Sequence, residues 1–161
     1  YNQAEKYFSE SMTIKRDLDD QRGLVSVLIN YAELHLVQQH WEEMRTLCNN
    51  AIEIIGDQPF HEPQAIATFL TGLWHFESGD INLGVKHFAL AIAIAWNFNA
   101  SLGQRINRSI ARHLNTMDQL GKTKDTSGLV ESILDNAGRM IKDNNSAALD
   151  NLRNILMAEL R

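Results

Sequence analysis

The chain repeats itself with a period of 40 residues, and this period constrains its fold more than any other feature. When the sequence is shifted by 40 or 80 residues, apolar and small residues fall into common columns. Three of these columns are Phe8/Cys48/Phe88, Ser11/Ala51/Ala91 and Ile14/Ile54/Ile94. A period of a few tens of residues is typical of repeat architectures, in which each copy buries its apolar face against its neighbours. Such folds present extended surfaces for binding rather than one reaction centre.

Within each copy, apolar residues recur at spacings of three and four, which indicates amphipathic helices. Gln38–His40 separates the two halves of the second copy, and Ser78–Asp80 does so one period later, where Gly79 suits a helix end. The clearest break in the chain lies at Pro59 and Pro63, because proline removes a helical hydrogen bond. Each unit is therefore predicted to be two antiparallel helices joined by a tight turn.

We therefore expect an all-α fold: a right-handed α-solenoid of antiparallel helix pairs with about eight helices. Residues 1–20 are predicted to supply the second helix of an incomplete first repeat. Residues 21–57 and 61–97 form two full repeats, 98–143 a divergent helix pair, and 145–161 a closing helix. Terminal repeats are expected to be atypical because they close the open end of a stack.

The incomplete first copy carries two expectations. The sequence is expected to be a fragment of a longer protein, or a domain without its upstream repeats. Four residues of this copy, Tyr1, Ala4, Phe8 and Met12, are expected to lie exposed, and such an apolar flank favours association at high concentration.

The columns of small and large residues resemble the tetratricopeptide repeat (TPR). The second copy reads Leu28-x2-Tyr31-Ala32-x2-His35 and then Met44-x3-Cys48-x2-Ala51, and the third reads Thr68-x2-Thr71-Gly72-x2-His75 and then Gly84-x3-Phe88-x2-Ala91. The family's signature likewise places a small residue on the first helix and Ala-x3-Phe on the second. Units of 40 residues rather than 34 resemble the long repeats of kinesin light chains and of bacterial multidomain signalling ATPases and transcription regulators.

Composition favours a cytoplasmic binding protein over other classes. The net charge of −5 gives no dominant basic footprint, so this segment is not expected to contact nucleic acid. The stretch Leu90–Ala95 is too short for a transmembrane helix, and no membrane contact is expected. A single cysteine, Cys48, excludes an internal disulfide and indicates no oxidising compartment.

No residue pattern indicates an enzyme, a metal site or a cofactor. His35 and His75 occupy one column, but no acid or cysteine recurs beside them as a further ligand, so we interpret them as packed histidines. Cys48 stands where the repeat has a bulky apolar residue and is interpreted as buried. The acidic residues Glu42 and Glu43 are adjacent rather than spaced as a catalytic pair and are interpreted as a solvated helix end.

The TPR resemblance implies a concave face lined by the first helix of each unit. The residues expected to face a partner there are Asn30, Glu33, Phe69, Leu73 and Phe76. Asn30 stands just before the Tyr31-Ala32 pair, where peptide-binding members of the family carry an asparagine that holds the ligand backbone. The third copy has Leu70 at that place. The alternative is that these side chains pack against a neighbouring helix or a dimer mate.

A second candidate surface is basic. Arg105, Arg108 and Arg112 recur at intervals of three and four on one predicted helix, with Lys122 and Lys124 beyond it. Such arginines could receive an acidic peptide through bidentate contacts. The alternative is an ordinary solvated helix face.

These observations favour a protein–protein interaction module. The family resemblance suggests the sensory or scaffolding part of a larger bacterial signalling or transcription-regulatory protein. Two alternatives remain: a receptor domain that closes its concave face on a peptide or small ligand, and a homo-oligomerisation module that forms a homodimer.

Overall fold

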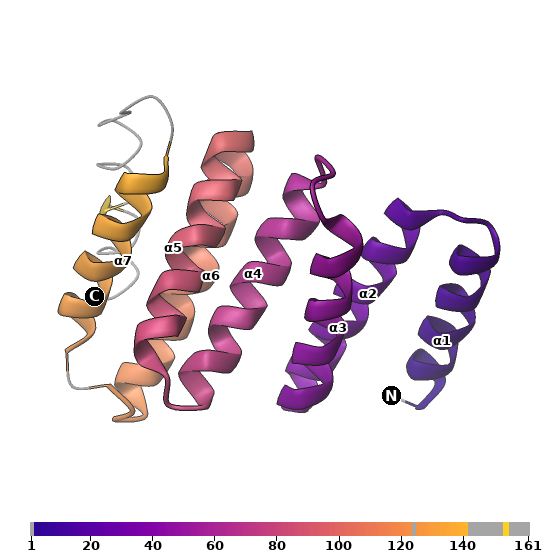
Figure 1. Ribbon diagram of the computed structural model, residues 1–161. Coiled ribbons are helices and arrows are strands. Elements are labelled where there is room, and N and C mark those ends of the chain that lie inside the picture. The colour runs from indigo at the N-terminus through magenta and orange to yellow at the C-terminus, as the bar shows by residue number, and fades with distance from the viewer. Residues whose placement is uncertain (1, 124, 142–152, 155–161) are drawn as a thin grey trace.

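The structure is a computed structural model that describes residues 2–123, 125–141 and 153–154. The described residues are all-α, as predicted, and contain no strand. They form seven helices: α1 (Asn2–Asp17), α2 (Gln21–Gln38), α3 (Trp41–Ile55), α4 (His61–Glu77), α5 (Ile81–Phe98), α6 (Ala100–Gln119) and α7 (Thr126–Met140) (Figure 1). The closing helix predicted over 145–161 lies outside the described residues, apart from 153–154.

The helix boundaries follow from local side-chain chemistry. The side chains of Asp20, Asp80, Asn99 and Asp125 each accept a hydrogen bond from the backbone N–H three residues later, which caps α2, α5, α6 and α7. In the turn between α4 and α5, Gly79 adopts a left-handed φ of 83°. Gln39 occupies the same column one period earlier and is also left-handed, with φ of 60°. The backbone turn therefore repeats even where glycine does not.

From α1 to α6, consecutive helices pack against one another along the chain, and α4 with α5 makes the most extensive contact. The even-numbered helices also touch, α2 with α4 and α4 with α6. In Figure 1, α2 lies behind α3 and α6 lies behind α5, with α4 between the two pairs. Helices α2, α4 and α6 are therefore neighbours on one side of the molecule.

The last helices depart from the predicted pairing. Residues 98–143 contain α6 and α7, but α7 packs mainly against α5 and barely touches α6, so the expectation of a helix pair there is wrong. The reason lies in the outer face of α5, where Ala89 and Ala93 are buried. The equivalent residues of α3, Asn49 and Glu53, are exposed. Because small apolar residues replace polar ones, α5 can accept a further helix that α3 cannot.

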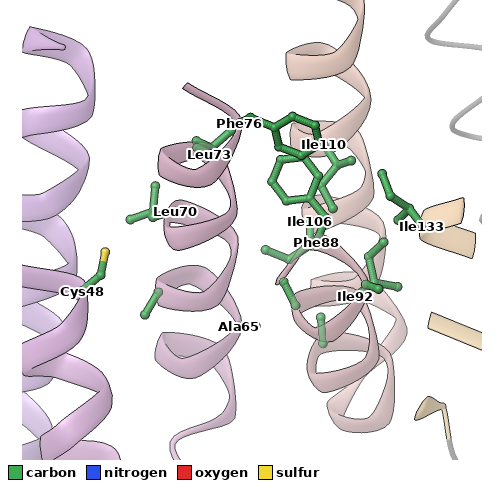
Figure 2. Packing of buried hydrophobic residues seen from close by; sticks show 14 of the residues in the cluster. Cys48, Ala65, Leu70, Leu73, Phe76, Phe88, Ile92, Ile106, Ile110 and Ile133 are labelled. Carbon is green, nitrogen blue, oxygen red and sulfur yellow. The ribbon is translucent and has the colours of Figure 1, made fainter. Parts of the chain in front are cut away.

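The core is densest where α4, α5 and α6 meet. The ring centroids of Phe76 and Phe88 lie 4.8 Å apart, and Ile106 and Ile110 of α6 are buried with them (Figure 2). Gly72 and Gly84 make room for these rings, since a Cβ at either glycine would come within 2.6 Å of a ring carbon. Close approach of the two helices thus depends on glycine at both positions.

The first helix does not expose the flank expected from the sequence. Phe8 stacks on Tyr31 of α2, with ring centroids 5.0 Å apart, and Met12 packs against the core. Ala4 is half-buried, and Tyr1 lies outside the described residues. The expected exposed set is therefore wrong, because α2 partly covers it. The exposed large apolar residues here are Tyr7 and Ile14 of α1, at 59% and 55%, and Leu18 in the turn that follows, at 69%.

One described helix, α5, is long and apolar enough to cross a bilayer by length and composition alone. Its 18 residues have a mean hydropathy of 1.3, and 44% of them are buried inside the fold. A helix that fills a protein core has the same composition, so this property is weak evidence for a span. Leu90–Ala95, the stretch singled out from the sequence, is only part of this helix.

Candidate interaction surface

The three even-numbered helices present equivalent columns on neighbouring surfaces. A shift of 40 residues from α2 to α4, and of 39 from α4 to α6, brings the buried small residues Ala32, Gly72 and Ala111 into one column. The same shifts align three further columns: Ser26/Ile66/Arg105, Ile29/Phe69/Arg108 and Glu33/Leu73/Arg112. Ile29 and Leu73 are buried, and we call the other residues of these columns the even-helix face. This face changes from polar residues on α2 to apolar residues on α4 and to arginine on α6.

The residues predicted for the concave face differ in their exposure to solvent. Asn30 and Glu33 are exposed on α2, and Phe69 is half-buried on α4. Leu73 and Phe76 are each only 4% exposed. The prediction that these two line an open binding face is wrong, because both belong to the core. A binding role for the other three residues stays a prediction.

Phe76 is turned away from the surface for a specific reason. Its ring lies over Gly84 of α5, where a Cβ would approach a Phe76 carbon to 2.6 Å. It also meets the edge of His113 from α6, with ring centroids 5.7 Å apart. A phenylalanine in this column follows the glycine opposite it, a partnership that spacing within one helix does not reveal.

The three arginines of α6 are all exposed, as the basic-surface prediction requires. Arg105 forms an ion pair with Glu62 at the start of α4. No carboxylate of the described residues lies within 4.0 Å of Arg108 or Arg112. Farther along, Lys122 is bound to Glu77 at 3.0 Å, and Lys124 lies outside the described residues. Among the described residues, Arg108 and Arg112 are therefore the part of the stripe without a carboxylate partner.

Glu33 connects this stripe to α2. Partial burial raises the pKa of the Glu33 carboxyl, and the positive charge of Arg105 acts in the opposite direction. Loss of hydration is the larger of the two effects on this pKa. The charge of Arg105 on α6 thus acts on the Glu33 carboxyl on α2.

The two aligned histidines have partners that sequence reasoning missed. His35 Nδ1 lies 3.3 Å from Nδ1 of His40, and the ring centroids of His75 and His87 lie 4.7 Å apart. Burial lowers the pKa of both His35 and His75. Among the described residues no three metal-ligating side chains come together. The His35–His40 pair spans the turn between α2 and α3, whereas His87 lies within α5, so the two pairs are visible only once the helix ends and their packing are known.

Two further features bear on chemistry. Cys48 is fully buried, and burial raises the pKa of its thiol to about 12, so the reactive thiolate is scarce at neutral pH. A cleft of about 370 Å³ opens between the ends of α1, α2 and α3. Its lining carries both charges, with Lys15 and Arg16 opposite Glu53, and selects no single charged ligand.

No protein-family model matches the chain, and neither a curated protein nor a solved structure matches it.

Proposed function

We propose that this protein is a protein–protein interaction module of the TPR kind, whose even-helix face receives a segment of a partner. In this proposal α2–α3 and α4–α5 are successive repeats of a right-handed solenoid. The observation that carries the proposal is the run of exposed Arg105, Arg108 and Arg112 in the same columns as the apolar residues of α4.

The chemistry of this face indicates the partner. Arg108 and Arg112, which have no carboxylate partner among the described residues, can bind carboxylates bidentately, and such charged contacts are stronger than those of neutral donors. The neighbouring half-buried side chains of Ile66 and Phe69 offer an apolar contact beside them. A partner segment with acidic and apolar residues fits both features. The 40-residue period further suggests a role as the sensory or scaffolding part of a larger signalling or transcription-regulatory protein.

The test compares fluorescent peptides of equal length, one acidic and apolar and the other basic and apolar. We expect the acidic peptide to bind more tightly and to weaken as salt rises, because exposed charges are screened beyond about 10 Å at 0.1 M. The double variant Arg108→Glu/Arg112→Glu should abolish this preference. Arg139→Glu, an exposed arginine on α7, is the matched control and should leave it unchanged.

Equal binding of the two peptides, or an equal loss of this preference in the α7 control, would mean that the arginines are ordinary solvated side chains. Circular dichroism of each variant checks that the helices are intact.

A further inference from the structure

Four cations follow one another along α6 and the turn after it: Arg105, Arg108, Arg112 and Lys122. The fold itself supplies a carboxylate to the first and the last of them. Arg105 is paired with Glu62 in the first turn of α4. Lys122 lies 3.0 Å from a carboxylate oxygen of Glu77, the last residue of α4. An ion pair thus joins each end of α4 to this row of cations.

The middle of α4 offers no such carboxylate. Between its first and last turns, α4 contains no aspartate or glutamate, and its residues on the even-helix face, Ile66 and Phe69, are apolar. Arg108 and Arg112 have no carboxylate within 4.0 Å among the described residues. The fold therefore pairs the outer two cations of the row and leaves the inner two for a ligand.

We propose that the even-helix face binds two acidic residues of its partner and no more, and that Glu62 sets this limit by occupying Arg105. This inference rests on the proposed function, because it specifies the acidic segment that the face receives. Arg108 and Arg112 are four residues apart on a helix, so their Cβ atoms lie about 5–6 Å apart. A segment that places two carboxylates at this separation, with an apolar side chain against Phe69, matches both features of the face.

A third carboxylate would have to replace Glu62 at Arg105. Arg105 is three residues before Arg108 and lies beside it on the helix surface, so distance does not prevent a third contact. The obstacle is the Glu62 side chain, which the fold already holds at this guanidinium. An incoming acid has to displace it and to approach its negative charge, and like charges brought together at an interface oppose binding.

The other borders of the face do not favour further acids either. On α2 the face consists of Ser26 and Glu33, neither of which is a cation. At the far end, Lys122 comes ten residues after Arg112 in the sequence. Its Nζ lies 3.2 and 3.0 Å from the two carboxylate oxygens of Glu77. The carboxylates of a partner are therefore restricted to the two inner arginines.

The test uses three fluorescent peptides of equal length that share their apolar residues and carry one, two or three clustered aspartates, with asparagine at the exchanged positions. Fluorescence anisotropy gives the Kd of each. For the unaltered protein, the second aspartate should tighten binding about two- to fivefold, the effect typical of an exposed ion pair. The third should change the Kd by less than about 1.5-fold, because it gains no new ion pair.

The variant Glu62→Gln should remove the limit. Glutamine keeps the shape of the side chain without its charge, so Arg105 becomes available to the partner. The third aspartate should then tighten binding about two- to fivefold as well. The quantity to compare is the ratio of the Kd values of the two-aspartate and three-aspartate peptides, since loss of a nearby negative charge should strengthen the binding of both.

Two variants are matched controls. Glu10→Gln also removes one carboxylate from an exposed ion pair, the one with Lys6 on α1, a helix that touches only α2 among the described helices. Glu77→Gln releases Lys122, which is too far along the chain from Arg112 to receive the third aspartate. Both variants should keep the ratio of the unaltered protein. Circular dichroism of each variant checks that the helix content is unchanged.

Three outcomes would overturn the proposal. They are a third aspartate that tightens binding to the unaltered protein as much as the second does, an unchanged ratio in Glu62→Gln, and an equal rise of the ratio in Glu10→Gln. In each case a preference for acidic peptides that Arg108→Glu/Arg112→Glu abolishes would still support the proposed function. Equal binding of all three peptides to every variant would contradict both.

Discussion

The second and third copies of the repeat solve one packing problem with different residues. In the third copy, α4 and α5 each place a phenylalanine against a glycine of the other helix: Phe88 lies on Gly72, and Phe76 lies on Gly84. The same four columns of the second copy hold Cys48, Ala32, Leu36 and Met44. In the third copy each pair combines a ring with a glycine, whereas in the second copy each pair combines side chains of more similar volume. The contrast indicates that complementarity between two columns matters more than the identity of either residue.

The largest expected difference between the copies lies in the Phe88/Cys48 column. Both side chains are 0% exposed. Phe88→Ala should lower the free energy of unfolding by about 3–5 kcal/mol, because it removes a ring from a packed core and leaves a cavity. Cys48→Ala removes only a sulfur atom and should cost about 1 kcal/mol. Urea unfolding monitored by circular dichroism measures both.

Similar losses in the two variants would show that the α4–α5 contact is no more dependent on its ring than α2–α3 is on its thiol. The substitution Ile52→Ala, at a residue 38% exposed on α3, serves as a control and should cost less than Phe88→Ala.

The next largest effect concerns pH, and it involves the third copy through its contact with α6. The ring centroid of His113 on α6 lies 5.7 Å from that of Phe76 and 5.9 Å from that of Phe88, and its buried Nε2 has no hydrogen-bond partner among the described residues. Burial lowers the pKa of His113 to about 4; the charge of Glu77 opposes this shift, and that of Lys122 adds to it. The unfolded chain therefore takes up a proton near pH 6.5 while the folded protein does not.

Stability should consequently fall as pH drops from about 6.5 to about 4, by up to about 3 kcal/mol from this residue. His113→Leu should remove most of this dependence, as seen in urea unfolding at several pH values. The pH dependence of stability in His35→Leu, from the second copy, is measured in the same way for comparison. An unchanged pH dependence in His113→Leu would mean that other groups, such as the carboxyl of Asp20 with its lowered pKa, control acid stability.

The difference between the copies also explains what the sequence could and could not predict. The all-α class and the turns at Gln38–His40 and Ser78–Asp80 follow from local spacing, and the structure has them. Placing Phe76 correctly required knowing that Gly84 of another helix lies opposite it. The packing of α7 on α5 likewise depends on Ala89 and Ala93, two small residues that a single-helix pattern does not distinguish from others. The spacing of residues along the chain predicts the helices. Which residues of two helices contact each other becomes clear only from the structure.

A smaller effect is expected at the small-residue column. Gly72→Ala should destabilise the protein by about 1–2 kcal/mol, because the new methyl group meets a fully buried ring, which outweighs the gain in helix propensity. Ala32→Gly makes the opposite change in the second copy and should cost about 1 kcal/mol through lost propensity. If Gly72→Ala instead stabilised the protein in thermal unfolding, the two helices would have enough freedom to move apart.

The smallest effect is the most informative, because it converts one copy into the other. The double variant Gly72→Ala/Phe88→Cys gives the third copy the alanine and cysteine of the second. The methyl group that meets the ring in Gly72→Ala meets no ring once Phe88 is replaced. The double variant should therefore be more stable than the sum of the two single effects predicts, with a coupling of about 1 kcal/mol.

Urea unfolding of the wild type, both single variants and the double variant gives the four free energies of unfolding that this double-mutant cycle needs. Gly121→Ala with Phe88→Cys is the control pair, since Gly121 lies in an exposed turn at φ 66°, where a Cβ costs backbone strain but meets no described atom beyond its chain neighbours within 4 Å. That pair should be additive, because sites without shared contacts do not couple. Additivity in the Gly72/Phe88 cycle as well would mean that the glycine and the ring act independently. The two copies would then differ by separate substitutions rather than by one exchange of volume across the helix contact.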